Sequence, residues 1–411
     1  MLDKILCQES ENLRNALQVI ENNAKGVCFI IDKKKCLLGL LTDGDIRRAL
    51  LKNADLESNV KLYMNKKFIA LPIDSEIELI NKYLSNKKYK IIPLCKSDGE
   101  VVDYVDSINL HSISVLSPSL DGNELKYITD CITTNWISSQ GKYVNKFEKI
   151  FDSIHENYYS LAVSSGTTAL HLSLVALGLK EGEEVIVPDF TFAATINSVL
   201  YCNATPVICE IKNDTWCIDE NKIEELISPK TKAIIPVHLY GQPCNMEKIM
   251  QISKKYNLVV IEDCAEAIGS QIGNKNVGTF GDSATFSFFG NKTITTGEGG
   301  MVIFKDKEKF NKAKLLRDHG MSREKKYWHE FVGFNYRMTN LQAAIGVAQM
   351  ERFNEIISKK QEIFQFYYEN LINFKGIHRL PIYSEKDINS SWLFTLIIDP
   401  NLERDKMINE F

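Results

Sequence analysis

The chain has 411 residues, enough for two or three domains at the usual size of roughly 150 residues each. Hydrophobic residues make up 44% and charged residues 25%, a balance that excludes a fibrous or disordered chain. The net charge of −4 supplies no positive field for a polyanion, so we expect no nucleic-acid partner.

The first residues lack the basic head and apolar stretch of a secretory signal, and no later run reaches about 18 apolar residues, the length of a membrane span. Ten cysteines are scattered without a Cys-x-x-Cys pair, a pattern that favours free thiols in a reducing compartment. We therefore expect a cytoplasmic protein without a membrane partner, and we assign no metal ligands.

Residues 1 to about 112 contain the same pattern twice. Apolar segments at 26–32 and 36–41 flank a turn of three lysines, and weaker copies at 90–95 and 101–105 flank the turn at 97–99. Two strand-turn-strand units, each with a flanking helix, indicate an internal duplication.

Within the first copy, residues 39–50 resemble the tandem CBS domain in the version that is fused to sugar-nucleotide enzymes. Its Gly-x-x-Thr-x-x-Asp element ends a strand and opens a helix. In that family these side chains contact the ribose and phosphates of an adenine nucleotide, so the resemblance implies Thr42 and Asp45 as contacts. The alternative is that Thr42 caps the helix and Asp45 favours its positive end. The second copy lacks the motif, so the sequence does not predict two equivalent sites.

After residue 112, strands of five to seven apolar residues alternate with helical stretches, a pattern typical of an open, mostly parallel α/β sheet. Seven strands are predicted, at residues 159–165, 183–189, 205–211, 232–240, 257–263, 283–289 and 299–304. They predict a large domain over residues 113–345.

A helical pattern at 341–350 continues into a charged helix that runs towards Phe374. One strand at 392–398 and the start of a helix follow before Phe411. A lone strand cannot bury its faces, so we expect a small C-terminal domain, residues 346–411, that is incomplete here.

Four features fall where an open parallel sheet binds its ligand, beyond the carboxyl ends of its strands. Residues 163–172 form a strand, a turn of small residues and a helix start, which suits a phosphate because the first helical turn has free N–H donors. Asp263 ends a buried strand and needs a cationic partner, either a protonated pyridine nitrogen or a metal. The small residues at the helix start and Asp263 could each instead be an ordinary helix cap.

The other two features are a lysine and an aromatic ring. Lys292 lies between a buried aromatic strand and a glycine-rich turn, and a lysine in such a dry place tends to lose its proton, as formation of a Schiff base requires. An isolated lysine is usually a solvated surface residue. Phe192 follows another strand and could stack on a planar cofactor or pack in the core. Together the four features describe a pyridoxal phosphate site.

From about residue 113 onward the chain resembles the sugar-nucleotide aminotransferases of the DegT/DnrJ/EryC1/StrS family. That family has the fold type I architecture, in which helices cover both faces of a seven-stranded sheet. The motifs that carry the resemblance are residues 141–148, 165–167, 236–241, 262–266, 291–300, 317–320 and 333–340.

The resemblance implies a role for each matching residue. Lys292 would bind pyridoxal 5′-phosphate as a Schiff base and move a proton between substrate and cofactor carbons, and Asp263 would keep the pyridine nitrogen protonated. Phe192 would stack on the ring, and Glu266, where the family often has Gln or His, would face its 3-hydroxyl. The phosphate would be bound by Gly166, Thr167 and Ser287, and by Asn335 and Arg337 of a neighbouring subunit, which implies a homodimer.

The segments 291–300 and 327–340 are most similar to perosamine synthases, which aminate C4 of a GDP-linked 4-keto-6-deoxy sugar. The expected activity is therefore transamination from L-glutamate to such a sugar, for surface glycan biosynthesis. Relatives with His in place of the lysine carry out dehydration instead, and Lys292 argues against that branch. One alternative is a nucleotide-sensing regulatory protein that acts through its CBS pair and retains the cofactor domain as a relic.

Overall fold

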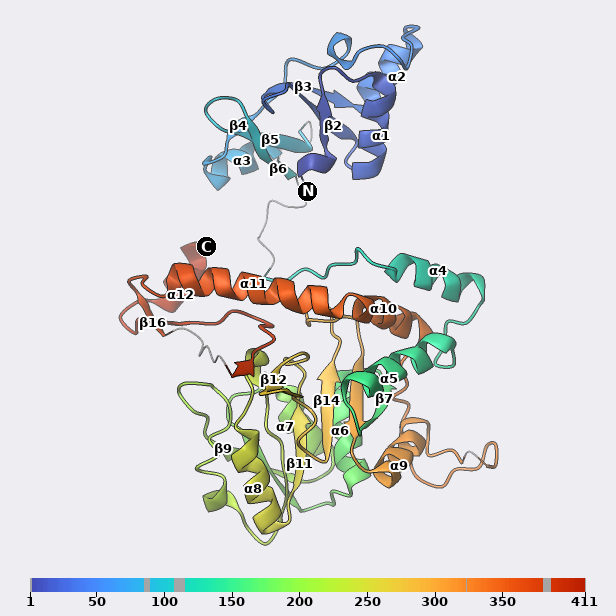
Figure 1. Cartoon of the computed structure of the whole chain (residues 1–411), viewed down its shortest axis with the longest axis vertical. Helices are drawn as coiled ribbons and strands as arrows, with labels where there is room; N and C mark the ends of the chain where they lie inside the picture. Colours follow the sequence, from blue (N-terminus) through green and yellow to red (C-terminus); the bar gives the residue numbers. More distant parts are fainter. Residues whose placement is uncertain (1, 85–88, 107–114, 323, 380–385, 411) are drawn as a thin grey trace. The chain divides into compact units, whose positions relative to one another are not determined.

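The chain forms two compact units, Met1–Val115 and Leu116–Phe411, in a computed structural model that describes residues 2–84, 89–106, 115–322, 324–379 and 386–410 (Figure 1). The predicted boundary at residue 112 lies outside the described residues. The boundary at 345/346 stays a prediction, since residues on both sides of it belong to one compact unit. Among the described residues, no helix combines the length and apolar character that a membrane crossing requires.

The N-terminal unit contains two three-stranded sheets of the same topology, in which the first strand runs parallel and the third antiparallel to the middle one. The first half comprises β1 (Leu6–Gln8), α1 (Leu13–Asn23), β2 (Val27–Ile31), β3 (Leu37–Thr42) and α2 (Asp43–Leu51), and the second comprises β4 (Leu71–Pro72), α3 (Ile77–Leu84), β5 (Ile91–Cys95) and β6 (Val101–Asp106). The structure therefore agrees with the predicted duplication.

The two halves of this unit share a hydrophobic core. All five residues of β2 are buried, and the Phe29 ring meets that of Tyr104 from β6 edge to face at 5.9 Å. Lys25 Nζ and Asp106 Oδ2 form an ion pair of 2.6 Å between the halves. Burial of apolar side chains between the two sheets holds the copies together as one unit.

A seven-stranded sheet forms the centre of the second unit. Its strands are β7 (Tyr159–Val163), β8 (Glu184–Pro188), β9 (Thr205–Cys209), β10 (Thr231–Ile234), β11 (Val259–Asp263), β14 (Ser283–Ser287) and β15 (Gly300–Phe304), in the order β7-β15-β14-β11-β10-β8-β9. Only β15 among these seven runs antiparallel to its neighbours. The predicted mostly parallel sheet is confirmed, although β10 is shorter than predicted and stops before Pro236, which has no N–H to donate.

Helices cover both faces of this sheet. One face carries α6 (Gly166–Leu177), α7 (Ala193–Tyr201) and α9 (Lys307–Arg317), and the other carries α5 (Lys142–Ile154), α8 (Met246–Tyr256) and α10 (Asn340–Glu351). The alternation of side chains along a strand explains this arrangement: Leu161 and Val163 pack towards α6 and α9, whereas Ala162 packs towards α5 and α10. The result is the predicted three-layer α/β fold.

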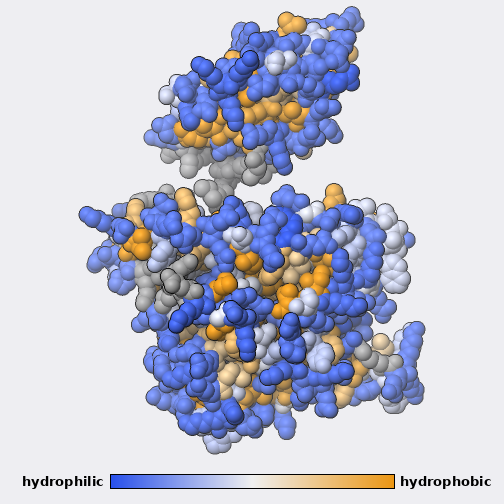
Figure 2. Space-filling model, in the orientation of Figure 1, coloured by the Kyte–Doolittle hydropathy of each residue, from blue (hydrophilic) through white to orange (hydrophobic). Residues whose placement is uncertain are grey.

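The remaining elements surround the edge of this core. They are α4 (Glu124–Thr133), β12 (Gln271–Ile272), β13 (Lys275–Asn276), α11 (Phe353–Leu371), β16 (Ile377–Arg379), β17 (Asp387–Ile388), β18 (Ile397–Ile398) and α12 (Arg404–Glu410), with 3-10 turns at Glu224–Leu226 and Leu239–Gly241. The N-terminal unit has 3-10 turns of its own at Leu2–Lys4 and Val60–Leu62. On the face that Figure 2 shows, both units are mostly hydrophilic with separate hydrophobic patches.

Two predictions for the C-terminal part are wrong in detail. The long helical pattern is interrupted at Arg352, which caps α10 with a non-helical backbone before α11 begins. The predicted strand at 392–398 is reduced to β18, which pairs with β16. Just before the predicted strand, the chain is attached to a loop of the large sheet, because Ser390 N donates to Ser270 Oγ at 3.0 Å.

Candidate active site

A cavity of about 330 Å³ lies at the carboxyl ends of the central strands of the second unit. Its walls combine a helix N-terminus, carboxylates, one lysine and aromatic rings, the mixture expected of a cofactor site. The lining residues are Ser165, Gly166, Thr167, Leu170, Thr191, Phe192, Ala194, Val237, Asp263, Ala265, Glu266, Ser287, Phe289, Asn291, Lys292, Glu298 and Trp392.

The start of α6 forms one wall. Ser165 caps this helix: its hydroxyl accepts a hydrogen bond from Thr168 N at 3.1 Å, and Thr168 Oγ1 accepts one from Ser165 N at 3.0 Å. A Cβ at Gly166 would lie 2.9 Å from Ser287 Cβ, so only glycine lets the helix start approach β14 this closely. The first-turn N–H groups and the Ser287 hydroxyl together suit the binding of a phosphate.

Asp263 forms the floor at the end of β11. Its carboxyl is 4% exposed, accepts hydrogen bonds from Thr195 Oγ1 at 2.9 Å and Ala265 N at 3.1 Å, and lies among buried groups. Burial raises the pKa of this carboxyl, while these two donors and the nearby Lys292 charge act to lower it. A carboxylate in this setting gains most from a cationic partner inside the cavity.

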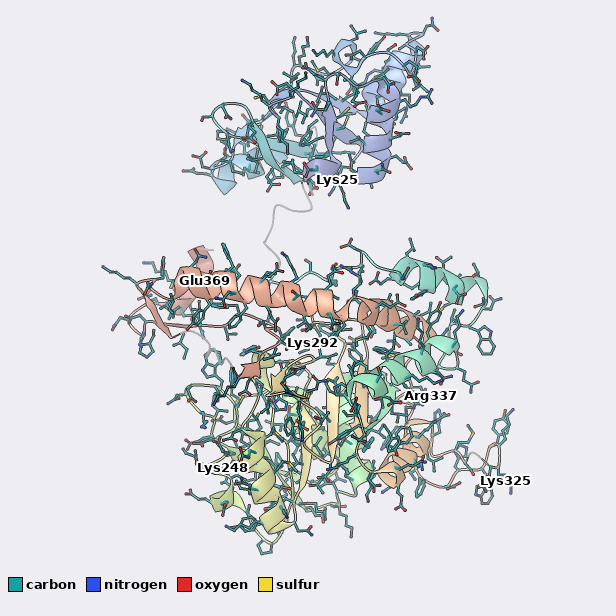
Figure 3. All side chains as sticks on the ribbon, in the orientation of Figure 1. Lys25, Lys248, Lys292, Lys325, Arg337 and Glu369 are labelled. Atoms are coloured by element: carbon teal, nitrogen blue, oxygen red, sulfur yellow. The ribbon has the colours of Figure 1, made fainter. Side chains whose placement is uncertain are left out.

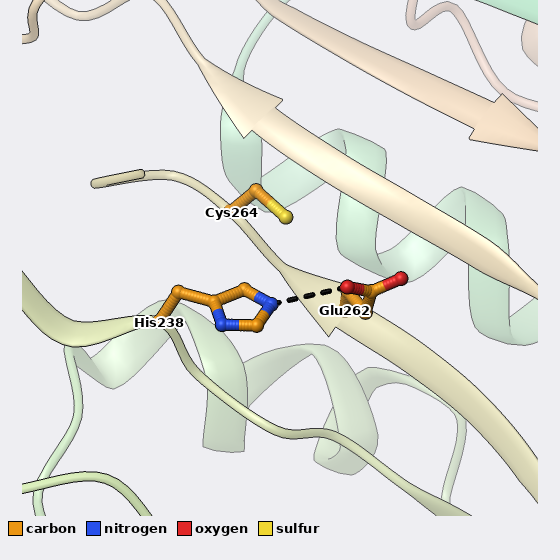
Figure 4. Close-up of side chains that lie close together, drawn as sticks. All are labelled: His238, Glu262 and Cys264. Atoms are coloured by element: carbon orange, nitrogen blue, oxygen red, sulfur yellow. Dashed lines mark hydrogen bonds and ion pairs between the residues drawn. The ribbon is translucent and has the colours of Figure 1, made fainter. Parts of the chain in front are cut away.

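A buried group next to Asp263 fixes the end of β11 (Figure 4). His238 Nδ1 accepts from Cys244 N at 3.0 Å, so Nε2 carries the hydrogen and donates to Glu262 Oε2 at 3.1 Å. Although His238, Glu262 and Cys264 have potential ligand atoms within 4.8 Å of one another, Glu262 also accepts from three backbone N–H groups, those of residues 278, 280 and 281. The His238 and Glu262 atoms are engaged in these hydrogen bonds, so the pair braces the strand end.

Lys292 and Glu266 face each other across the cavity. The lysine Nζ lies 3.5 Å from Glu266 Oε1, and the side chains are 14% and 11% exposed. Burial lowers the pKa of Lys292, and the nearby negative charges of Glu266 and Asp263 partly oppose that effect. Burial likewise raises the pKa of Glu266, against the lowering effect of Lys292. The site therefore favours a neutral, nucleophilic amine more than water does.

Phe192 precedes α7 and lines the cavity, with 73% of the residue exposed. Sequence analysis missed Trp392, which also lines the cavity and whose ring centroid lies 3.8 Å from Lys292 Nζ. It also missed Thr195, which sits one helical turn into α7 and reaches Asp263. No local signal marks either residue, because each acquires its role through a tertiary contact with a distant segment.

Asn335 and Arg337 are not among the residues that line this cavity. Figure 3 labels Arg337 at a distance from Lys292. Arg337 Nη1 binds Asp318 Oδ1 at 2.7 Å, and its Nε donates to Asn335 Oδ1 at 3.1 Å. Thr42 and Asp45 belong to the other unit, where they form a capping box at the start of α2. The cavity thus combines seven of the predicted residues, namely Gly166, Thr167, Phe192, Asp263, Glu266, Ser287 and Lys292.

The residues of the cavity fit pyridoxal phosphate. A neutral helix start that tolerates only glycine suits the phosphate, a buried carboxylate suits a protonated pyridine nitrogen, and a buried amine suits the aldehyde. Together with the three-layer fold, these groups define a pyridoxal phosphate-dependent aminotransferase of fold type I.

Comparison with known proteins agrees with this class. The model of the DegT/DnrJ/EryC1/StrS aminotransferase family matches residues 118–411, and that of the CBS domain matches residues 1–52. The chain belongs to the DegT/DnrJ/EryC1/StrS aminotransferase family. Beyond residue 52, the second half of the N-terminal unit repeats the strand topology of the first half.

The chain is 47% identical over 298 residues to GDP-perosamine synthase of Escherichia coli O157:H7, covering 72% of this chain and 81% of that protein. Among solved structures it is similar to an aminotransferase from Psychrobacter cryohalolentis, with 32% identity and a TM-score of 0.68 over 72% of this chain and 81% of that chain. It is also similar to Spr1654 of Streptococcus pneumoniae in its PLP form, with 27% identity and a TM-score of 0.69 over 73% and 82%.

Proposed function

We propose that this aminotransferase moves the amino group of L-glutamate to C4 of a GDP-linked 4-keto-6-deoxy sugar, the reaction that forms GDP-perosamine for a surface glycan. The observation that carries the proposal is the buried Lys292 amine, 3.5 Å from Glu266 in a cavity floored by Asp263. The name of the relative at 47% identity supports the choice of sugar. The complete set of cofactor groups argues against a relic domain, and a cytoplasmic location stays a prediction.

Each side chain has a defined task in this proposal. When bound, pyridoxal phosphate supplies an electron-accepting ring that stabilises negative charge on the substrate carbon. Asp263 holds a proton on the ring nitrogen, and Thr195 and Ala265 N fix the orientation of its carboxyl. Lys292 would hold the cofactor through its aldehyde, and its amine would act as the base that moves a proton at the substrate carbon. Glu266, whose Oε1 lies 3.5 Å from Lys292 Nζ, would hold the amine on its own side of the cavity.

The proposal includes a homodimer. Arg337 and Asn335 are oriented by Asp318 and by each other, outside the cavity of their own chain. A cation held in this way can reach the phosphate of a second copy, as the family resemblance implies. Sedimentation velocity of wild type and of Arg337→Ala, with the cofactor's affinity measured on both, tests this: weaker cofactor binding in the variant supports a shared site, and a purely monomeric wild type contradicts it.

The absorption spectrum during reaction tests the proposed activity. The purified full chain, loaded with cofactor, should lose its visible band on addition of L-glutamate and regain it on addition of GDP-4-keto-6-deoxymannose. Lys292→Ala is the control that should show neither change. Recovery of the band with a UDP- or dTDP-linked keto sugar alone would contradict the GDP-sugar assignment, and no response to any sugar nucleotide would contradict the activity.

For the N-terminal unit we propose an adenine nucleotide as ligand, with Thr42 and Asp45 as contacts. The CBS match over residues 1–52 supports this. However, the capping box already uses both side chains, since Asp45 Oδ2 accepts from Thr42 N at 3.0 Å and from its Oγ1 at 2.6 Å. Calorimetry of the full chain with AMP and ATP should show binding that Asp45→Asn weakens. No heat with either nucleotide would favour the purely structural role of the box.

A further inference from the structure

Trp392 contacts both the Lys292 amine and the backbone just before this lysine. Its ring centroid lies 3.8 Å from Lys292 Nζ, and its Nε1 donates to the backbone carbonyl of Asn291 at 2.7 Å, the residue just before the lysine. The indole is 8% exposed and forms part of the cavity wall. One ring therefore limits where the amine can move and how much water can reach it.

The segment 389–392, which carries this tryptophan, is locked onto the large sheet's loops. Ser270 Oγ accepts from Ser390 N at 3.0 Å and donates to Gly241 O at 2.6 Å. A Cβ at Gly241 would lie 2.9 Å from Ser391 N, so the two backbones approach as closely as only glycine permits. Ser391 has a φ of 55°, an uncommon left-handed backbone for a serine. A segment held this tightly places its side chain in one position.

The same ring also supports the turn that binds Glu266. Trp392 stacks on Tyr240 with centroids 6.1 Å apart and planes 16° apart, and Tyr240 N donates to Glu266 Oε2 at 2.8 Å. Tyr240 itself has a φ of 53°. Strained backbone of this kind costs free energy and persists where surrounding contacts enforce it, often at functional sites. The lysine and its carboxylate partner are thus both supported by one indole.

We propose that Trp392 is a positioning residue for the transamination: it holds the Lys292 amine against the cavity wall opposite Glu266 and shields it from water. This rests on the proposed function, in which Lys292 is the reacting amine. Trp392 lies 100 positions after Lys292 in the sequence, and the contacts of residues 389–392 with the loops of the large sheet place its ring beside the lysine. Its aromatic face is what the amine contacts, so phenylalanine should substitute for it better than an aliphatic side chain.

The first measurement uses the full-length apoprotein and needs no catalysis. Competitive acetylation with acetic anhydride, read by mass spectrometry at high pH, reports how accessible each lysine amine is, with the exposed Lys254 as internal reference. In Trp392→Leu the limiting reactivity of Lys292 should rise several-fold, because no ring covers the nitrogen. Trp392→Phe should stay close to wild type.

The second measurement is the single-turnover rate of cofactor bleaching by L-glutamate. Trp392→Leu should lower the maximal rate by about tenfold to a hundredfold, the range expected for a misplaced reacting group, with little change in the half-saturating glutamate concentration. Trp392→Phe should recover most of this loss. A fall confined to glutamate affinity would overturn the proposal, since it would place Trp392 in substrate binding instead.

Trp216→Leu is the matched control. Trp216 also contacts Tyr240, edge to face at 6.0 Å, but it does not line the cavity. Trp216→Leu should leave both the acetylation of Lys292 and the rate of cofactor bleaching as in wild type. Unchanged Lys292 acetylation in Trp392→Leu, or equal effects of the two substitutions, would contradict a positioning role. If acetylation responds as expected but no keto sugar accepts the amino group, the proposed function fails while the placement of the amine by Trp392 stands.

Discussion

Each unit contains a helix that begins with a capping box directly after a strand, and the two helix starts differ in charge and surroundings. At α2 the first turn carries Asp43 and Asp45, and Asp45 is further paired with Arg48 at 2.6 Å. At α6 the box consists of Ser165 and Thr168, and the first turn has no acidic residue. The positive end of the helix dipole is partly neutralised by carboxylates in α2 and remains available to an anion in α6.

The surroundings add to this difference. The start of α6 lies beside the ends of β11 and β14, so that Asp263 and Ser287 share its cavity with Lys292. The same kind of capping box therefore suits a phosphate site at α6, where the ends of other strands converge on the helix start. At α2 it serves as a helix cap, because the Asp45 carboxylate of the box occupies the helix start. This comparison separates what a short motif specifies from what the tertiary fold adds.

The largest effect should come from removing the amine that distinguishes the α6 site. Lys292→Ala removes both the covalent anchor and the proton carrier, so turnover should fall by at least roughly 10⁴-fold. The fold should persist, because Glu266 is the one buried charge among the described residues that loses its ion-pair partner in this variant. Steady-state assays and circular dichroism check this, with Lys254→Ala, at an exposed lysine, as control; substantial turnover in Lys292→Ala would refute the site.

Asp263→Asn tests whether the charge at the end of β11 is required. The substitution keeps the size and one acceptor oxygen but cannot hold a proton on the ring nitrogen, so kcat should drop by about 10²-fold or more. Asp282→Asn is the control, since Asp282 Oδ2 accepts only a structural bond from Val260 N at 2.9 Å outside the cavity. Equal losses in both variants would indicate a general loss of packing.

The sequence was sufficient for the sheet and for the residues that stand beside a strand end. Seven apolar runs and the glycine-rich turns marked the strands, and Asp263, Lys292 and Gly166 followed from their places after them. Trp392 could not be found in this way, because nothing in its neighbourhood shows that its ring lies over a lysine 100 residues earlier. The strand predicted at 392–398 failed for a related reason: tertiary hydrogen bonds from Trp392 Nε1 to Asn291 O and from Lys360 Nζ to Trp392 O outweigh local β propensity at its start.

A methyl group at each helix start sharpens the comparison between α2 and α6. In Gly166→Ala the new Cβ would meet Ser287 Cβ at 2.9 Å, so cofactor affinity should fall by about tenfold or more, as for other overpacked sites. In Gly44→Ala the nearest atom is Arg48 Nη1 at 3.3 Å, the end of a flexible side chain, and helix propensity should stabilise the unit by about 0.5–1 kcal/mol. Cofactor titration of both variants checks this, and equal affinities would contradict a phosphate at α6.

The pH dependence of cofactor uptake tests the electrostatics around Lys292. Burial lowers the pKa of this amine, so the rate of uptake by apoprotein should rise with pH and level off below the range of an ordinary lysine. Glu266 acts in the opposite direction, since its negative charge favours the protonated amine. Glu266→Gln should therefore move the midpoint to lower pH, as stopped-flow absorbance can show; a shift to higher pH would mean that the carboxyl is not charged beside the lysine.

The smallest effect belongs to the capping box of α2. Thr42→Ala removes the acceptor for Asp45 N and should destabilise the helix start by about 1 kcal/mol, which hydrogen exchange would register as faster exchange at the first turn of α2. Transamination should be unchanged, because the cavity lies in the other unit. The corresponding change in α6, Ser165→Ala, removes a comparable bond but also disturbs the phosphate site, so it should weaken cofactor binding as well. Loss of activity in Thr42→Ala would instead show that the state of the N-terminal unit controls the enzyme, and would make a regulatory ligand there the next question.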